Sequence, residues 1–101
     1  MIRHIVMWKV AADTEIERQA ACELVKRQFE SLAGRVPGLL HIEVGVDISR
    51  IDYAADVVLL SDFESVSALR AYADHPAHTA VRDALEGVRT WRQQVDYAVP
   101  N

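Results

Sequence analysis

The sequence has no long hydrophobic run, a single cysteine and no cluster of basic residues. The first strand-like segment, residues 2–10, contains a histidine and two basic residues and is short, so we expect it to be neither a signal peptide nor a membrane span. Cys22 cannot form an internal disulfide, and nothing in the sequence indicates an oxidising compartment. The 15 acidic and 11 basic residues give a formal charge of −4, whereas phosphate binding requires a basic face. We therefore expect a cytoplasmic protein that binds neither nucleic acid nor membrane.

The sequence also lacks the motifs of several large enzyme classes. It contains no P-loop, no dinucleotide-binding glycine fingerprint, no CxxC pair, no HExxH and no GxSxG. No group of histidines and carboxylates has the close spacing of a metal site. We therefore expect neither a cofactor nor a metal, and the chemistry that remains is that of histidine, tyrosine and aspartate.

Length and apolar pattern predict one α+β domain that spans residues 1–101. Half of the residues are apolar, as in ordinary globular proteins. Alternation of apolar and polar residues predicts strands over 2–10, 39–46 and 91–99, and an apolar run predicts one over 55–60, while a period of three to four predicts helices between them. The resulting β-α-β-β-α-α-β order is typical of a ferredoxin-like fold, in which an antiparallel four-stranded sheet carries helices on one face.

Three residues mark where the predicted helices begin. Thr14 precedes Glu17 by three positions, which is the spacing of a capping box. Ser65 is a suitable N-cap for the second helix. Pro76 ends that helix, because the residue before a proline is pushed out of the helical region, and it begins the third helix.

The predicted sheet has apolar residues on both faces, although the helices can cover only one. Residues 57–60 are all apolar, which is typical of a strand covered on both sides. A monomer would expose a large apolar surface, and such a surface usually marks an interface. A two-fold partner that packs its own sheet against this one would cover it. We therefore expect a homodimer.

The segment 72–78 (YADHPAH) has the highest density of groups capable of proton transfer. If Pro76 begins a helix, His78 lies in its first turn, where the helix dipole favours the neutral imidazole that acts as a base. The same residues are equally consistent with His75 as an N-cap and His78 as a solvated side chain. Tyr72 is then a core residue with its hydroxyl at the rim.

Two further candidates lie on predicted strands. His4 is in the middle of the first strand, where a histidine is either a hydrogen-bonded core residue or a catalytic group. Asp96, in the last strand, is either the partner that orients an imidazole or an exposed edge carboxylate. His41 has only Glu43 near it on its face, and we expect it at the surface.

Four segments together resemble the stress-responsive dimeric α/β-barrel family, often called Dabb. They are residues 3–6 (RHIV), residues 56–59 (DVVL) with 63–65 (FES), the YxxHPxH segment 72–78 and residues 96–97 (DY), and the similarity covers nearly the whole chain. The resemblance implies a ferredoxin-like homodimer whose two sheets close into a barrel with the helices outside. Members of the family differ in activity: some are stress-induced proteins, and one plant member is a cofactor-free polyketide cyclase.

The resemblance to this cyclase implies a catalytic set. His78 matches the base, which would remove an acidic proton from a carbon between two carbonyls. Asp96 matches an aspartate beside the base that would hold its tautomer. His4 and Tyr72 match the groups that would stabilise the developing enolate oxygen.

The substrate-binding residues implied by the resemblance are Val6, Trp8 and Val57. Val57 lies near the position of a further pocket histidine in the cyclase. Cys22 and Glu23 correspond roughly to bulky pocket residues of its first helix. These differences indicate a small aromatic or polyketide-like ligand other than the substrate of the cyclase.

These features favour a cofactor-independent cyclase or lyase that acts on a small enolisable carbonyl or polyketide-like compound by histidine general-base catalysis. One alternative is a non-catalytic stress-response or small-ligand-binding homodimer. A further alternative is a cofactor-free monooxygenase of the related dimeric barrel fold, supported only by Trp8 and the histidines. The enzyme hypothesis requires His4, Tyr72 and His78 to line one partly apolar pocket, with Asp96 within hydrogen-bonding distance of His78.

Overall fold

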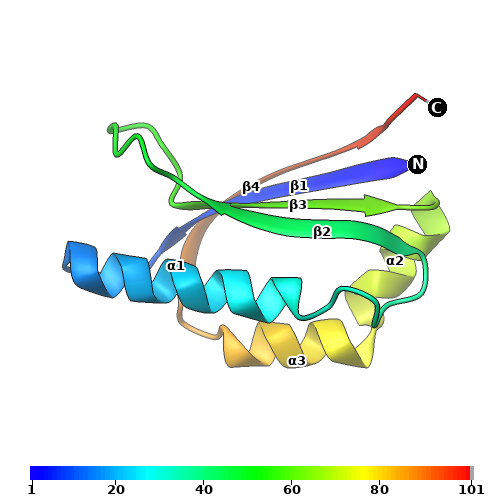
Figure 1. The fold of residues 1–101 in the computed structure, drawn as a ribbon, viewed down its shortest axis with the longest axis horizontal. Helices are drawn as coiled ribbons and strands as arrows, with labels where there is room; N and C mark the ends of the chain where they lie inside the picture. Colours follow the sequence, from blue (N-terminus) through cyan, green and yellow to red (C-terminus); the bar gives the residue numbers. More distant parts are fainter. Residues whose placement is uncertain (101) are drawn as a thin grey trace.

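The computed structural model describes residues 1–100 and contains one four-stranded antiparallel sheet (Figure 1). The strands are β1 (Ile2–Val10), β2 (Leu39–Val46), β3 (Val57–Phe63) and β4 (Arg89–Ala98). Their order across the sheet is β2-β3-β1-β4, so β3 and β1 are central and β2 and β4 form the edges. This topology confirms the predicted ferredoxin-like α+β fold.

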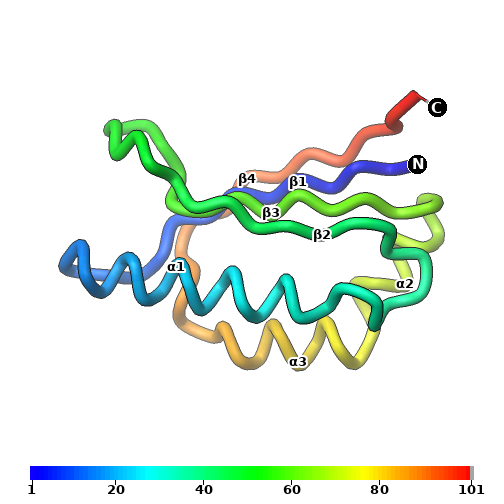
Figure 2. Tube along the Cα trace, viewed as in Figure 1, coloured from blue at the N-terminus to red at the C-terminus, as the bar shows by residue number. Residues whose placement is uncertain are grey.

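Three helices, α1 (Glu15–Glu30), α2 (Val66–Asp74) and α3 (Pro76–Ala84), cover a single face of the sheet. In Figure 2 the traces of all three helices lie below the strands, and within residues 1–100 the opposite face of the sheet carries no helix. None of these helices, within residues 1–100, has the length and apolar character needed to span a bilayer.

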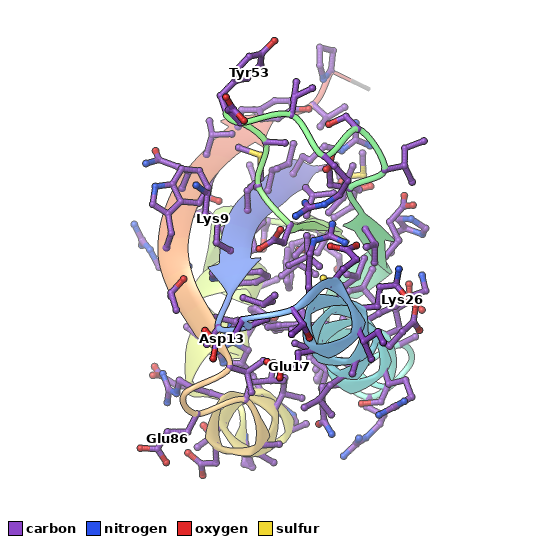
Figure 3. The ribbon with its side chains drawn as sticks, turned by 90° about the vertical axis from the view of Figure 1, so that its left-hand side faces the viewer. Lys9, Asp13, Glu17, Lys26, Tyr53 and Glu86 are labelled. Atoms are coloured by element: carbon purple, nitrogen blue, oxygen red, sulfur yellow. The ribbon has the colours of Figure 1, made fainter. Side chains whose placement is uncertain are left out.

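The predicted caps of the first two helices are confirmed by hydrogen bonds. The Thr14 hydroxyl accepts from the backbone N–H of Glu17 at 3.1 Å, and the Glu17 carboxylate accepts from the N–H of Asp13 at 3.0 Å. Figure 3 shows the Asp13 and Glu17 side chains beside each other at the start of α1. The Ser65 hydroxyl accepts from the N–H of Ala68 at 3.1 Å and begins α2 in the same way.

The break between α2 and α3 confirms the capping interpretation of His75. The backbone of His75 is extended, as expected before Pro76, and its Nδ1 accepts from the N–H of Ala77 at 3.0 Å. His75 is therefore committed to the start of α3. The break also brings Tyr72 at the end of α2 next to His78 in the first turn of α3, with 4.3 Å between ring centroids.

The strand β3 is shifted relative to the prediction, because it includes residues 61–63 and starts at Val57. Its polar residues are stabilised by tertiary contacts that the alternation does not reveal. The Ser61 hydroxyl donates to the carbonyl of His4 at 3.3 Å, and the Asp62 carboxylate accepts from the Arg3 guanidinium at 2.8 Å.

The side-chain pattern of β2 also differs from the prediction at one end. Strict alternation would place Leu40 on the same face as Ile42, but Leu40 is 57% exposed, whereas Leu39 packs against the core. A register irregularity between Leu39 and His41 explains this difference, because an extra residue in a strand reverses the facing of the residues beyond it.

The hydrophobic core lies between the sheet and the helices. On β1, the alternate residues Val6, Trp8 and Val10 point toward the helices and are buried. The Trp8 ring stacks on Phe29 of α1 at a centroid distance of 5.2 Å. Cys22 is completely buried in the same core.

The uncovered face of the sheet carries a row of apolar side chains. Ile5 in β1 is paired with Leu60 of β3 on one side and with Val95 of β4 on the other. Val95 is 52% exposed, and the neighbouring Tyr97 is 42% exposed. Within residues 1–100, both faces of the sheet therefore carry apolar side chains, as predicted, and the helices cover only one of them.

Candidate functional site

A cavity of about 690 Å³ lies between the β1–β4 edge of the sheet and helices α2 and α3. Its apolar wall includes Ile2 from β1 and Val66 and Leu69 from α2. Its polar wall contains His4, Tyr72, His78 and Asp96 together with several arginines. The four residues expected to form the catalytic set therefore line a single cavity.

His4 and Asp96 form a close pair across the β1–β4 ladder. The two residues are direct partners in the strand register, and His4 Nδ1 lies 2.5 Å from Asp96 Oδ1. The second carboxylate oxygen, Oδ2, accepts from the side-chain amide of Gln94 at 3.1 Å. Asp96 was expected to hold His78, but its structural partner is His4, because antiparallel register fixes the two β residues side by side.

His78 is instead oriented by the backbone of α2. Its Nδ1 lies 3.1 Å from the carbonyl of Ala73, so Nδ1–H donates and Nε2 keeps an unprotonated lone pair. Burial lowers the pKa of His78, and the positive charges of Arg82 and Arg89 lower it further, against the opposing effect of the Ala73 carbonyl. The neutral imidazole is therefore favoured at pH 7, through burial and neighbouring positive charge.

Tyr72 lies between the two histidines and is almost completely buried. Its ring centroid is 6.3 Å from that of His4, and the residue is only 3% exposed. Within residues 1–100 its hydroxyl has no hydrogen-bond partner. Burial raises the pKa of this hydroxyl, so it remains protonated and is a donor. A ligand oxygen placed against it would restore the hydrogen bond that the hydroxyl loses on folding.

The three predicted substrate-binding residues do not line this cavity. Val6, Trp8 and Val57 are 1%, 3% and 2% exposed and belong to the hydrophobic core. They lie in the core between the sheet and the helices, where Trp8 stacks on Phe29 of α1. Trp8 contributes indirectly, because it lies beneath the guanidinium of Arg89, which does line the cavity.

The sequence reasoning missed the arginines of the cavity. Arg92 faces the same side as Gln94 and Asp96, and strict alternation back from Asp96 would have found it. Arg89 is an odd number of residues from Asp96, so regular alternation would place it on the opposite face of the strand. In the described residues, no group of three or more His, Cys, Asp or Glu side chains is arranged to hold a metal ion.

The fold and cavity define a class of small ferredoxin-like proteins with a ligand-sized cavity between the sheet and the helices. The family model of the stress responsive A/B barrel domain, Dabb, matches residues 2–99. The chain belongs to this family, as the resemblance indicated.

The chain is similar to proteins whose activity is not assigned. It is 29% identical over 99 residues to an uncharacterised protein of Streptomyces coelicolor, covering 98% of this chain and 95% of the relative. It is 27% identical to a dimeric protein of unknown function with a ferredoxin-like fold from Bacteroides fragilis. That structure superposes with a TM-score of 0.85, and the match covers 97% of this chain and 95% of the other.

Two enzymes share the fold at lower sequence identity. A hydroxynitrile lyase from Passiflora edulis is 14% identical, with a TM-score of 0.79 and coverage of 98% and 93% of the two chains. A putative antibiotic biosynthesis monooxygenase from Nitrosomonas europaea is 19% identical, with a TM-score of 0.72 and coverage of 98% of both. At these identities the similarity establishes the fold alone.

Proposed function

We propose that this protein is a cofactor-independent enzyme that removes a proton from the carbon next to a carbonyl in a small cyclase- or lyase-type substrate. The observation that carries this proposal is the convergence of His78, Tyr72 and the His4–Asp96 pair on one partly apolar cavity. Enolate chemistry requires a base and polar groups that stabilise the developing oxygen, and these side chains are of both kinds.

The proposed step begins at Nε2 of His78. This nitrogen takes the proton of the acidic C–H bond, and the electron pair of that bond forms a carbon–carbon double bond as the carbonyl π electrons move to oxygen. The Tyr72 hydroxyl donates to this oxygen, and His4, which Asp96 holds through Nδ1, places its imidazole ring beside Tyr72 at the same site. The proton held by His78 then returns to carbon, or it neutralises the alkoxide formed when the enolate attacks a second carbonyl of the same molecule.

The test is hydrogen–deuterium exchange at the benzylic carbon of methyl phenylpyruvate, a neutral enolisable ketone, followed by NMR in D₂O. We expect the wild-type protein to accelerate exchange, and we expect His78→Gln to reduce the acceleration by about 10²-fold or more, which is typical of the loss of a general base. His41→Gln is the matched control, because His41 is an exposed histidine paired with Glu43 outside the cavity. Binding without exchange in the wild type would instead favour the non-catalytic small-ligand protein.

The monooxygenase alternative receives less support from the residues. Trp8, the residue that suggested it, is stacked on Phe29 in the core and does not line the cavity. Proton transfer by the imidazoles of the cavity needs no molecular oxygen. The enolate proposal gives a role to His78, Tyr72 and the His4–Asp96 pair, and we prefer it for that reason.

We also propose that the protein is a homodimer in which the uncovered sheet faces pack together into a barrel. The row formed by Ile5, Leu60 and Val95 supports this arrangement, as do the structurally similar proteins described as dimeric. Val95→Asp places a charge in the proposed interface and is expected to give monomers in sedimentation equilibrium. Ile16→Asp is the control, because Ile16 is 81% exposed on α1. Unchanged dimers in Val95→Asp would refute the arrangement.

A further inference from the structure

The cavity is lined by cationic side chains, although the whole chain carries a formal charge of −4. Arg70, Arg82, Arg89 and Arg92 all line it, and Asp96 is the single carboxylate among the described lining residues. Within residues 1–100, none of the four arginines forms a salt bridge with a carboxylate. The cavity therefore holds an excess of positive charge that the protein itself does not neutralise.

An irregularity in β4 places two of these arginines on the same side of the sheet. Trp8 pairs with Arg92 and Val10 pairs with Arg89, so three steps along β4 correspond to two along β1. In a regular strand, residues three apart would face opposite sides. The extra residue turns Arg89 toward the helices, where it lies with Arg92.

Both guanidiniums are supported by the aromatic core. The Arg89 guanidinium lies 4.7 Å from the centroid of the Trp8 ring and 5.4 Å from that of Phe29. The Arg92 guanidinium lies 5.8 Å from the Trp8 ring. Burial and the charge of Arg92 lower the pKa of Arg89, which nevertheless stays protonated because it is an arginine. Two crowded cations on a rigid aromatic support are pre-organised to bind an anion.

A hydrogen-bond chain links these cations to the proposed catalytic groups. Arg92 donates to the side-chain carbonyl of Gln94, the Gln94 amide donates to Asp96 at 3.1 Å, and Asp96 holds His4. The three β4 residues are successive positions on one face of the strand. An anion held by Arg92 would therefore lie in the same connected site as the His4–Asp96 pair.

We propose that the substrate of this cavity is a carbonyl compound that carries a carboxylate, with the carboxylate bound by Arg89 and Arg92. The apolar wall formed by Ile2, Val66 and Leu69 would contact the remainder of the molecule. This inference rests on the proposed function for the reaction, but the carboxylate contact is a matter of binding alone. A planar carboxylate matches the fork of a guanidinium, which can donate two parallel hydrogen bonds to it.

The test compares the binding of three probes by isothermal titration calorimetry. Phenylpyruvate carries the carboxylate, methyl phenylpyruvate has the same carbon skeleton with one added methyl group and no charge, and phenyl phosphate carries a different anion. We expect phenylpyruvate to bind at least about tenfold more tightly than its methyl ester, because charge-assisted hydrogen bonds are stronger than neutral ones. Equal affinity for acid and ester, or tighter binding of phenyl phosphate, would overturn the proposal.

Arginine variants locate the contact. Arg92→Gln and Arg89→Gln are each expected to reduce the preference for phenylpyruvate over its ester by about tenfold. Arg35→Gln is the matched control, because it makes the same charge change at an exposed residue outside the cavity. Since Arg89 packs on core aromatic rings, the exposed Arg92 provides the variant that keeps the core intact. Retention of the full preference in Arg92→Gln and Arg89→Gln would contradict the assignment.

The carboxylate site and the His78 mechanism can be refuted independently of each other. If the acid is preferred and His78→Gln leaves the exchange of the neutral ester unchanged, the carboxylate site stands and the His78 mechanism is wrong. If exchange depends on His78 but acid and ester bind equally, the mechanism stands and the carboxylate site is wrong.

Discussion

Removal of the Tyr72 hydroxyl should stabilise the unliganded protein. This hydroxyl is buried and has no hydrogen-bond partner within residues 1–100, so folding removes its hydrogen bond to water without a replacement. An unsatisfied buried hydroxyl costs about 1–3 kcal/mol. Tyr72→Phe removes that cost while keeping the ring, which packs 5.0 Å from Phe63 and 4.3 Å from His78 between centroids.

The expected gain is about 1–2 kcal/mol in the free energy of unfolding, because the space left by the lost oxygen offsets part of the benefit. For a domain of this size each kcal/mol corresponds to roughly 4–8 °C in the melting temperature. Urea unfolding followed by circular dichroism measures the gain, at one fixed protein concentration because an oligomer is stabilised by mass action.

Tyr53→Phe is the matched control for this experiment. Tyr53 is 87% exposed, and Figure 3 shows it at the outer tip of the connection between β2 and β3. Its substitution should change the stability by less than about 0.5 kcal/mol. If Tyr72→Phe is less stable than the wild type, the hydroxyl has a partner in the folded protein and the reasoning fails. If the hydroxyl serves an enolate, the same variant should slow deuterium exchange by about 10²-fold, so stability and activity should change in opposite directions.

Two further predictions concern a turn and the pH dependence of stability. Gly38 has a φ of +81°, and an added Cβ would lie 2.6 Å from the Cβ of Ala68. Gly38→Ala should therefore lower the midpoint of urea unfolding clearly more than Gly34→Ala, because Gly34 has a similar φ but open space around it. Equal losses in the two variants would refute the steric argument. The folded-state pKa of His78 lies below its ordinary value of 6.5, so the unfolded chain binds this proton more readily. Stability should therefore fall as the pH decreases below about 6.5, and His78→Gln should lose part of this fall in urea titrations, whereas an unchanged pH profile would contradict the lowered pKa.

The sequence predicted the elements that depend on local signals. Strands β1 and β2 have the predicted bounds, and Thr14, Ser65 and Pro76 begin the helices as expected. Each signal acts within a few residues: a side chain satisfies a nearby N–H group, or a ring fixes one dihedral angle. The end of β3 escaped prediction because Ser61 and Asp62 are stabilised by β1, which lies about sixty positions earlier in the chain.

The candidate site was predicted in its members but not in its pairing. The resemblance supplied His4, Tyr72, His78 and Asp96, and all four line one cavity. Which imidazole Asp96 contacts depends on the register between the first and last strands, and no local pattern encodes that register. Arg89 escaped for a related reason, because the irregularity in β4 reverses its expected facing.

The positive charge of the cavity should couple the pKa of His78 to the binding of an anionic substrate. Burial lowers the pKa of His78, and Arg82 and Arg89 lower it further, while the carbonyl of Ala73 opposes them. A carboxylate bound to the arginines would offset their charge, so the pKa of His78 should rise when phenylpyruvate binds. The base would then be strengthened by the arrival of its own substrate.

NMR titration of the histidine ring protons tests this link. The pKa of His78 should be higher in the phenylpyruvate complex than in the unliganded protein, and methyl phenylpyruvate should produce a smaller rise because it brings no charge. In the unliganded protein, Arg89→Gln should raise the same pKa, since one of the cations that opposes protonation is gone, whereas Arg35→Gln should leave it unchanged. A pKa that is indifferent to both the acid and Arg89→Gln would separate the base from the arginines, and the excess positive charge would then have no part in the chemistry of His78.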